Sequence, residues 1–382
     1  MVKTFERSII MNKIKLAVIN DIHFGVDDSQ RIYNELHQFT DFLKSHDIDI
    51  LVIDGDYFDR KLSVTDTATY LAVSYFNQLF DICKEKKIKF RMVQGTLWHE
   101  LNQLQIFESR QYEDGIDFKI IKTVGKEDID GLHVLYIPEE YPLDPEEYYG
   151  DYKKDKYNII FGHGTWDFVA FDNQIAHGNQ SNVKSVPVFM WNEWKDCIPD
   201  GFVTFGHIHG RNVYSDKIYY CGAFSRWSYG ERSARGFTYI EYDLDDKKYD
   251  VKFIDNTEAP KYDEIAVEDL NINDLPVEEV QKLLDEELKK TDNLAIDLNG
   301  LSSENIEILK KVYAKNPHVK IKVSESKQVL KESAEEDKKF EKYEYITKRK
   351  LPMDQTIKKF CEEDLKCEIP LDVITDILKE SK

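Results

Sequence analysis

The chain has 382 residues, of which 41% are hydrophobic and 32% charged, and 72 acidic against 52 basic side chains give a net charge of −20. This composition excludes a chain that is disordered throughout, and the length predicts two or three domains, one with a substantial core. No apolar run is long enough for a membrane span and the start lacks the features of a signal peptide, so we expect a cytoplasmic protein without membrane contact. The acidic balance argues against avid duplex DNA binding by bulk charge, so a polyanionic substrate would need a local counter-charge such as metal ions.

Short apolar segments of β type alternate with amphipathic helical segments in the first half of the chain, a pattern typical of α/β layering. Apolar residues recur on one helical face over 32–43 and over 70–80, which predicts two crossover helices. We expect a first domain over residues 1–256. Its predicted strands are 15–20, 49–53, 88–93, 132–137, 157–161 and 202–205, with later strands near 219–220 and over 237–243.

A second α/β pattern predicts a small capping domain over residues 257–326. Its predicted elements are a helix at 277–290, a strand at 293–299, a helix at 303–314 and a strand at 319–323.

Residues 327–382 read as a charged linker followed by a helical tail. The apolar positions of its two short amphipathic stretches are Ile357, Phe360, Leu365, Val373, Ile374, Ile377 and Leu378. Helices this short are unstable alone, so we expect them to bind a partner surface. The alternative is that the tail docks back on the chain's own domains.

Aspartate and histidine residues follow five of the predicted strands. The segments are Asp21-Ile22-His23, Gly55-Asp56 with Asp59-Arg60, Gly95 to Glu100, Gly162-His163-Gly164, and Gly206-His207-Ile208-His209. Because ligands of α/β sheets bind beyond the carboxyl ends of the strands, we expect these side chains to form an active site at one edge.

The residue types at this edge predict bound metal ions. Imidazoles and carboxylates without thiolates suit divalent Mn, Fe, Zn or Co. Six ligand positions are about right for two ions that share a bridging carboxylate, and two ions roughly 4 Å apart serve in-line displacement at phosphorus. Each motif alone is often only a turn or a helix N-cap. The ordered set, however, predicts hydrolysis of a phosphoester.

The ordered motifs D-x-H, G-D-x-x-D, G-x-x-x-H-E, G-H-G and G-H-x-H resemble those of the calcineurin-like metallophosphoesterases, and they lie within residues 14–243. The segment 220–243, with Cys221 to Arg226, Gly230-Glu231 and Gly236-Phe237, is similar to the corresponding stretch of the Mre11/SbcD family of DNA-repair nucleases. The resemblance implies an SbcD-type subunit of bacterial or phage origin. Its expected fold is a two-sheet αββα sandwich with a small α/β capping domain and a helical C-terminal tail.

The same resemblance implies roles for individual residues. One ion would be held by Asp21, His23 and His209, a bridging position would fall to Asp56, and the second ion would be held by His163 and His207. Manganese is the metal we expect, and Fe, Co or Zn also fit these ligands.

The segment Gly95-Thr96-Leu97-Trp98-His99-Glu100 departs from the family pattern. His99 aligns with the catalytic histidine, which would orient the scissile phosphate or protonate the leaving oxygen. In the family an asparagine ligand directly precedes that histidine, whereas here it is missing and two residues are inserted. Its place could be taken by Thr96, by His99 itself, by Asn102 or by water.

The resemblance implies a Mn-dependent nuclease that cuts DNA ends exonucleolytically and single strands endonucleolytically. It also implies a homodimer whose tail grips the coiled coil of an SbcC/Rad50-type ATPase. One alternative is a metallophosphoesterase acting on a small or protein phosphoester. The other is a catalytically weak scaffold for the ATPase, which the six other ligand positions disfavour because buried Asp and His clusters are costly without an ion.

Overall fold

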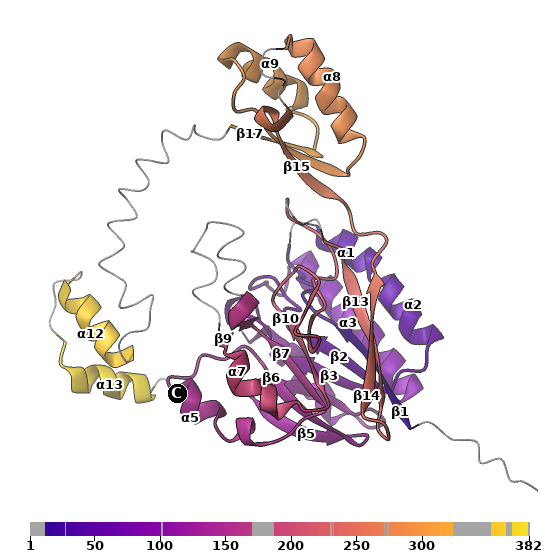
Figure 1. Ribbon diagram of the computed structural model, residues 1–382, viewed down its shortest axis with the longest axis vertical. Coiled ribbons are helices and arrows are strands. Elements are labelled where there is room, and N and C mark those ends of the chain that lie inside the picture. The colour runs from indigo at the N-terminus through magenta and orange to yellow at the C-terminus, as the bar shows by residue number, and fades with distance from the viewer. Residues whose placement is uncertain are drawn as a thin grey trace, which may run out of the picture.

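The computed structural model describes residues 12–26, 28–100, 102–169, 187–229, 231, 233–270, 272, 275–323, 353–363 and 369–380. These residues form a large α/β body, a smaller lobe that follows residue 256, and two C-terminal helices (Figure 1). None of the helices in these ranges is both long and apolar enough to cross a bilayer.

Two six-stranded sheets form the centre of the body. In the first sheet β1, β2, β3 and β4 are parallel, β13 is antiparallel to β1, and β14 is antiparallel to β13. Its strands, in spatial order, are β14 (Lys248–Asp255), β13 (Gly236–Asp243), β1 (Lys13–Ile19), β2 (Ile50–Asp54), β3 (Lys89–Val93) and β4 (Phe118–Ile121).

In the second sheet β12, β10, β7 and β6 are parallel, and β11 and β5 form antiparallel edges. Its strands are β11 (Asn212–Tyr214), β12 (Ile218–Tyr220), β10 (Phe202–Gly206), β7 (Ile159–His163), β6 (Leu132–Ile137) and β5 (Gly125–Ile129). A small ribbon pairs β8 (Thr165–Trp166) with β9 (Val188–Phe189).

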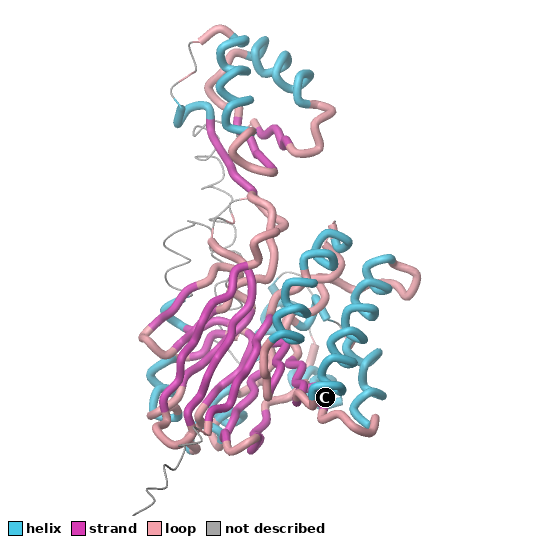
Figure 2. The backbone as a smooth tube through the Cα atoms, turned by 90° about the vertical axis from the view of Figure 1, so that its right-hand side faces the viewer, coloured by secondary structure: helices cyan, strands magenta, loops and turns pink. Residues whose placement is uncertain are grey.

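The alternation of side chains along the strands divides the body into four layers. In β1, Leu16 and Val18 enter the core between the two sheets, whereas Ala17 and Ile19 enter the core under the helices. The outer face of the second sheet has its own core, in which Phe205 packs with Trp166. Figure 2 shows the strands in layers with helices along their side. The expected α/β fold with two sheets is confirmed.

The helices of the body cover the two outer faces. On the first sheet lie α1 (Ser29–Glu35), α2 (His37–Ser45) and α3 (Thr67–Lys86), and on the second lie α5 (Pro145–Tyr149) and α7 (Trp191–Trp194). The single helix expected over 32–43 is two helices that meet at Leu36, which ends α1 and begins α2. Shorter pieces are α4 (Leu97–Glu100) and the 3-10 helices Gln103–Tyr112, Tyr152–Lys154 and Lys195–Cys197.

The smaller lobe is a parallel sheet packed with two helices. Its elements are β15 (Tyr262–Ala266), the 3-10 helix Val267–Leu270, α8 (Val277–Leu288), β16 (Asn293–Asp297), α9 (Ser303–Tyr313) and β17 (Val319–Lys322). Val280 and Leu284 of α8, Leu309 of α9 and Ile296 of β16 are fully buried in a core of their own. The Ser302 side chain caps α9 by accepting a hydrogen bond from the Asn305 amide.

The C-terminal helices α12 (Met353–Glu363) and α13 (Leu371–Glu380) pack on each other. The Thr375 hydroxyl donates a hydrogen bond to Asp354 Oδ2 at 3.3 Å. Among the residues expected to bind a partner, Ile374 is buried, Val373 is exposed, and Ile357, Phe360 and Leu378 are half-buried. Leu365 and the side chain of Ile377 lie outside the described residues.

Candidate metal centre

Six parallel strands, three from each sheet, end at one edge of the body. In the first sheet Asp21 and His23 follow β1, Asp56 follows β2 and Thr96 follows β3. In the second sheet Glu139 follows β6, His163 ends β7, and His207 and His209 follow β10. The side chains that these strands deliver form adjoining clusters at this edge.

Tight left-handed turns direct these side chains inward. Asp21, His23, Asp56 and His207 have φ angles of 48°, 58°, 48° and 83°. Such angles cost on the order of 1 kcal/mol or more for a residue other than glycine, and they gather at functional sites. Backbone hydrogen bonds hold the first two turns together, because the amides of Asp21 and His23 donate to the carbonyls of Gly55 and Asp56 at 3.1 and 3.0 Å.

The turn after β2 requires glycine at position 55. Gly55 has a φ of +90°, and a β-carbon there would overlap the ring of His163. Because His163 packs directly on the glycine backbone, its imidazole reaches Asp56, and its Nε2 lies 3.2 Å from Asp56 Oδ2.

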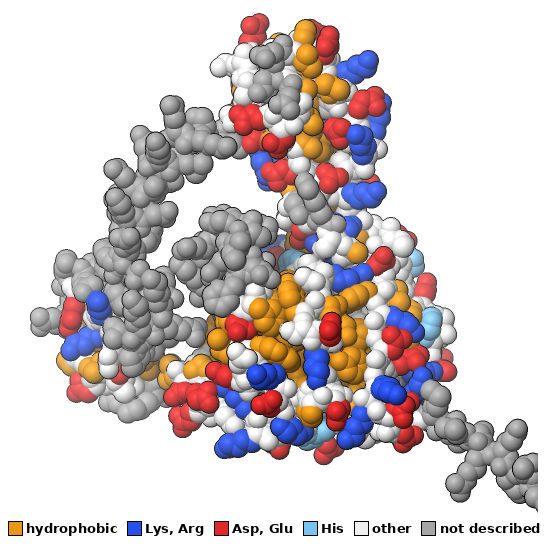
Figure 3. Space-filling view, viewed as in Figure 1, with side chains coloured by type: hydrophobic (Ala, Val, Ile, Leu, Met, Phe, Trp, Pro, Cys, Tyr) orange, Lys and Arg blue, Asp and Glu red, His pale blue; other side chains and the backbone are white. Residues whose placement is uncertain are grey.

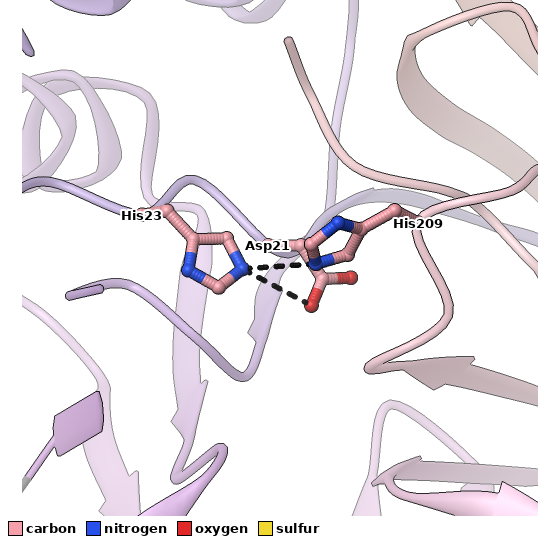
Figure 4. A group of neighbouring side chains, drawn as sticks. All are labelled: Asp21, His23 and His209. Carbon is pink, nitrogen blue, oxygen red and sulfur yellow. Dashed lines mark hydrogen bonds and ion pairs between the residues drawn. The ribbon is translucent and has the colours of Figure 1, made fainter. Parts of the chain in front are cut away.

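The first cluster consists of Asp21, His23 and His209 (Figure 4). His23 Nε2 lies 3.2 Å from His209 Nε2 and 3.8 Å from Asp21 Oδ1. The imidazoles point toward each other and toward the carboxylate, so three ligand atoms from two segments far apart in the chain converge on one point.

Two further carboxylates set the orientation of these imidazoles. Asp59 Oδ1 lies 3.2 Å from His23 Nδ1, and Glu231 Oε1 lies 3.3 Å from His209 Nδ1. Glu231 is itself held by the Arg235 guanidinium at 3.4 Å. A carboxylate at Nδ1 favours the proton on that nitrogen and leaves the Nε2 lone pair free to bind a metal.

The second cluster consists of Asp56, His163 and His207. His163 Nδ1 lies 3.1 Å from the Asp54 carbonyl oxygen, which turns Nε2 toward Asp56. Asp56 also belongs to a third group with His23 and His99, so its carboxylate lies between the two ion sites. This is the position that a bridging ligand needs.

His99 stands at the opening of the site, with 29% of its side chain exposed. Its Nδ1 lies 3.0 Å from Asp56 Oδ2. Burial alone lowers the pKa of His99, but the contact with Asp56 outweighs it and the pKa is raised. A protonated imidazole that is open to solvent can meet the phosphate of a substrate.

The charges within the site are strongly coupled. Burial alone raises the pKa of the Asp56 carboxyl, but His163, His99 and His23 hold it well below its usual range. Burial lowers the pKa of His163, yet Asp56 raises it well above its usual range. Burial and the nearby His163 lower the pKa of His207 to about 4. His207 is therefore neutral near pH 7, whereas a bound cation would have to displace the proton that Asp56 favours on His163.

Glu100 supports the loops that carry the ligands. Its two carboxylate oxygens accept hydrogen bonds at 2.9 Å from the backbone amides of Tyr57 and Gly95. Burial and the nearby Asp56 raise the pKa of Glu100 to about 7. Glu100 therefore joins the loop after β2 to the loop after β3.

The donor set fits two divalent cations. The Nε2 atoms of His23 and His209 face each other at 3.2 Å while a carboxylate occupies the Nδ1 side of each ring. Two facing lone pairs repel each other unless a cation lies between them, and imidazole with carboxylate suits Mn, Fe, Zn or Co. Asp21, His23, Asp56 and His209 could hold one ion, and Asp56, His163 and His207 could hold the other.

The structure brings together the six expected ligand residues, with His99 and Thr96 beside them. It does not bring Asn102 to the site, since this residue is exposed at the start of the 3-10 helix Gln103–Tyr112. Sequence reasoning missed Glu139, and it named Asp59 and Glu231 without giving them a role beside the imidazoles. Glu139 follows the predicted strand 132–137, so the rule that found the other ligands applies to it as well.

A family model and several known proteins match parts of this chain. The family model described as calcineurin-like phosphoesterase matches residues 14–211. The chain is similar to the 244L protein of Invertebrate iridescent virus 6, which is named as a phosphoesterase. The identity is 25% over 235 residues, which are 59% of this chain and 75% of the viral protein. Among solved structures, the chain is similar to GAP50 of Plasmodium, described as the anchor in the inner membrane complex. The identity is 16% and the TM-score 0.40, with 64% of this chain and 85% of the other covered.

Proposed function

Because the chain belongs to the calcineurin-like phosphoesterase family, we propose that it is a two-metal phosphodiesterase that cuts DNA as an SbcD-type nuclease subunit. The observation that carries the hydrolytic chemistry is the position of Asp56, which is shared by the group with His23 and the group with His163. Two bound ions would supply an activated water and electrostatic stabilisation of the phosphoryl oxygens. Manganese is the cofactor we propose.

The protein's own residues would perform the remaining tasks. His99 would contact the scissile phosphate or give its proton to the leaving oxygen, because its ring is partly exposed and its Nδ1 is fixed by Asp56. Asp59 and Glu231 would hold the imidazoles of His23 and His209 in the orientation that binding requires.

The attachment of the smaller lobe supports a nucleic-acid substrate. β14 runs parallel to β1, since both are antiparallel to β13, so its carboxyl end lies at the same edge as Asp21 and His23. The link to β15 therefore leaves the body beside the metal centre, and Arg226 donates a hydrogen bond to the Ala259 carbonyl of this link. This position of the link supports our proposal that the lobe helps to present a long substrate.

One loop contacts both the metal centre and the lobe. Trp227 lies 4.7 Å from His23 and 5.0 Å from His209, measured between ring centroids. Two residues later, the Tyr229 ring lies 5.2 Å from that of Tyr262 in β15, and the Lys320 ammonium of β17 lies 5.7 Å from it. This loop therefore connects the lobe with the imidazoles of the metal centre.

The remaining parts of the proposal concern partners and location. The α12–α13 pair leaves Val373 exposed, and we propose that this pair grips an SbcC/Rad50-type ATPase that controls access to DNA ends and single strands. We further propose a homodimer in the cytoplasm of a bacterium or of the host cell of a phage. Acidic and basic side chains are interspersed on the face shown in Figure 3, so affinity for DNA would depend on the ions and the partner.

A metallophosphoesterase that acts on a small or protein phosphoester is the second candidate. A cleft of about 1070 Å³ adjoins the site, and its lining includes Glu139, Glu140, Asp144 and Glu147. An acidic cleft repels a polyanion such as DNA, and this observation favours a small or protein phosphoester as the substrate. A scaffold without activity is opposed by the donor set described above.

The test is hydrolysis of end-labelled single- and double-stranded DNA by the purified full chain in Mn, in Mg and in EDTA, with Asp56→Ala as the control. Cutting that needs both Mn and Asp56 supports the nuclease. Hydrolysis of a small chromogenic phosphodiester without any cutting of DNA, even after the ATPase partner is added, would favour the second candidate. Inactivity on every substrate would favour the scaffold.

A further inference from the structure

We propose that Glu139 is a ligand of the second ion and takes the place of the asparagine that the segment 95–99 lacks. This inference rests on the proposed two-metal function and deepens it. It also implies that the site prefers phosphodiesters to phosphomonoesters.

Glu139 is buried at the edge where the other ligands converge, directly after β6 and its neighbour Pro138. β6 pairs in parallel with β7, which ends in His163. Glu139 Oε2 lies 3.9 Å from His207 Nδ1. Ligand atoms that bind one such ion at about 2.0–2.2 Å lie up to roughly 4.4 Å apart, so this separation fits a shared ion.

Thr96 marks the same position from the other side. Its hydroxyl oxygen lies 3.1 Å from Asp56 Oδ2, 3.1 Å from Glu139 Oε2 and 3.4 Å from His163 Nε2. The hydroxyl therefore lies among the ligand atoms of the second site. It has a single proton, so it can donate to only one of the two carboxylates at a time.

A carboxylate is the stronger candidate ligand of the two. Thr96 offers a neutral hydroxyl, whereas Glu139 offers an anionic oxygen of the type that Mn and related ions bind firmly. Asp56 and Glu139 are both buried and both contact the same hydroxyl. Two buried carboxylates that contact the same hydroxyl repel each other when both are ionised, and a bound cation would relieve that repulsion.

The other oxygen of Glu139 is held away from the ion. The Tyr141 hydroxyl donates a hydrogen bond to Glu139 Oε1, and the Glu139 backbone amide donates to the Gln94 carbonyl at 3.3 Å. These contacts fix the side chain with Oε2 toward His207 and Thr96. Tyr141 is thus a positioning residue for the proposed ligand.

A third carboxylate changes the charge of the site. Asp21, Asp56 and Glu139 would supply three negative charges against four positive charges of two divalent ions, whereas a neutral asparagine would leave only two negative charges. A less positive site attracts a phosphomonoester, which carries about two charges at neutral pH, less strongly than its asparagine counterpart would. The expected substrate class is therefore a phosphodiester, which carries one charge per phosphate.

The test compares Glu139→Ala and Glu139→Gln with the neighbouring control Glu140→Gln. Glu140 lines the same cleft, but its carboxylate binds the Val124 amide and the Tyr148 hydroxyl, both at 2.7 Å. Manganese bound per chain would be measured by elemental analysis after gel filtration, and affinities by calorimetric titration. Circular dichroism would establish that each variant is folded, and the near-isosteric Gln variant serves if the Ala variant is not.

We expect Glu139→Ala to keep the first ion and to lose affinity for the second by at least the roughly 10–100-fold that removal of an orienting partner costs. The affinity of Glu139→Gln for the second ion should lie between those of Glu139→Ala and the unaltered protein. Glu140→Gln should bind both ions as the unaltered protein does. Two ions bound by Glu139→Ala with unchanged affinity would overturn the proposal, as would an unaltered protein that binds only one ion at saturating Mn. An unaltered protein that binds two ions but cuts no DNA would instead count against the proposed function alone.

The charge argument has its own measurement. The ratio of hydrolysis rates for a chromogenic phosphodiester and its phosphomonoester would be compared between the unaltered protein and Glu139→Gln in saturating Mn. Because the variant makes the site more positive, the ratio should shift toward the monoester. An unchanged ratio would refute the proposed preference for phosphodiesters over phosphomonoesters. The metal-binding measurements would still decide whether Glu139 is a ligand.

Discussion

His23 and His209 are 186 residues apart in the sequence, yet their Nε2 atoms lie 3.2 Å apart. Each ring has a carboxylate at its Nδ1, Asp59 for His23 and Glu231 for His209. The two carboxylates favour the proton on Nδ1 of each ring, which leaves the facing Nε2 atoms to bind a cation. This is a geometry prepared for a cation rather than for a hydrogen bond.

Removal of either positioning carboxylate should weaken metal binding. We expect Asp59→Asn and Glu231→Gln each to lower the affinity of the first ion by about 10–100-fold, because the imidazoles lose the partner that orients them. Calorimetric titration with Mn checks this. The matched control is Asp66→Asn, a nearby residue whose side chain caps α3, since asparagine caps a helix about as well as aspartate. Wild-type affinity in both carboxylate variants would show that the contacts do not orient the rings.

Bound metal should stabilise the fold. A ligand that binds only the folded state at about 100 times its Kd contributes about 2.7 kcal/mol per site, so Mn should raise the Tm and EDTA should lower it. Thermal unfolding followed by circular dichroism measures the shift. Asp56→Ala should abolish most of the shift, because this residue belongs to the ligand groups on both sides. The same Tm in Mn and in EDTA would contradict the assignment of the site.

Much of the fold follows from local patterns. The strands that carry ligands have continuous apolar cores, as in Ile50 to Ile53, and such segments are typical of buried parallel strands. The sequence does not predict β14, because the charged residues Lys248, Asp250 and Lys252 alternate with its apolar residues. Its positions are only exposed or half-buried. The break at Leu36 within the expected helix 32–43 leaves the apolar periodicity intact, so the periodicity does not reveal it.

Local sequence patterns likewise predict some residues of the site and not others. The D-x-H and G-H-x-H motifs predict metal ligands from the sequence alone, because the preceding strand and the residues typical of turns can be recognised there. Glu139 follows a predicted strand, but its contact with His207 depends on the order of the strands in the second sheet, and the contact of Glu231 with His209 depends on the path of a long loop. Those are tertiary properties that local reasoning does not provide.

Substitution of His99 should separate catalysis from binding. We expect His99→Ala to lower hydrolysis by about 10²–10⁴-fold, the usual contribution of a general acid or base, while Mn binding and DNA binding stay close to those of the unaltered protein. Rates with a chromogenic phosphodiester and Mn stoichiometry are the two measurements. The control is His133→Ala, a half-exposed histidine that pairs with Asp128 away from the site. A loss of bound Mn in the His99 variant would identify this residue as a ligand instead, and unchanged hydrolysis would remove it from the mechanism.

The last prediction concerns the ion pair that joins the two sheets. Arg91 of β3 is buried, and its guanidinium donates two hydrogen bonds to Glu127 of β5, at 2.8 and 2.9 Å. Burial alone raises the pKa of Glu127, but Arg91 and Lys119 outweigh it and lower the pKa to about 2 from an ordinary 4.5. A carboxyl whose pKa is lowered by folding stabilises the protein above its unfolded pKa, and this contribution is lost as the pH falls from about 4.5 toward about 2.

Glu127→Gln should therefore destabilise the protein by roughly 1–3 kcal/mol at pH 7, because the buried Arg91 loses its bidentate carboxylate and keeps only that of Asp117, 3.0 Å away. The difference from the unaltered protein should shrink progressively below pH 4.5, since protonation removes the same charge. Urea unfolding in EDTA between pH 7 and pH 3 measures this difference without the contribution of bound metal. The control is Asp155→Asn, which breaks the exposed pair with Lys126 and should leave stability unchanged. An equal loss of stability at pH 7 and pH 3 would show that the Glu127 side chain acts through its shape and not through its charge.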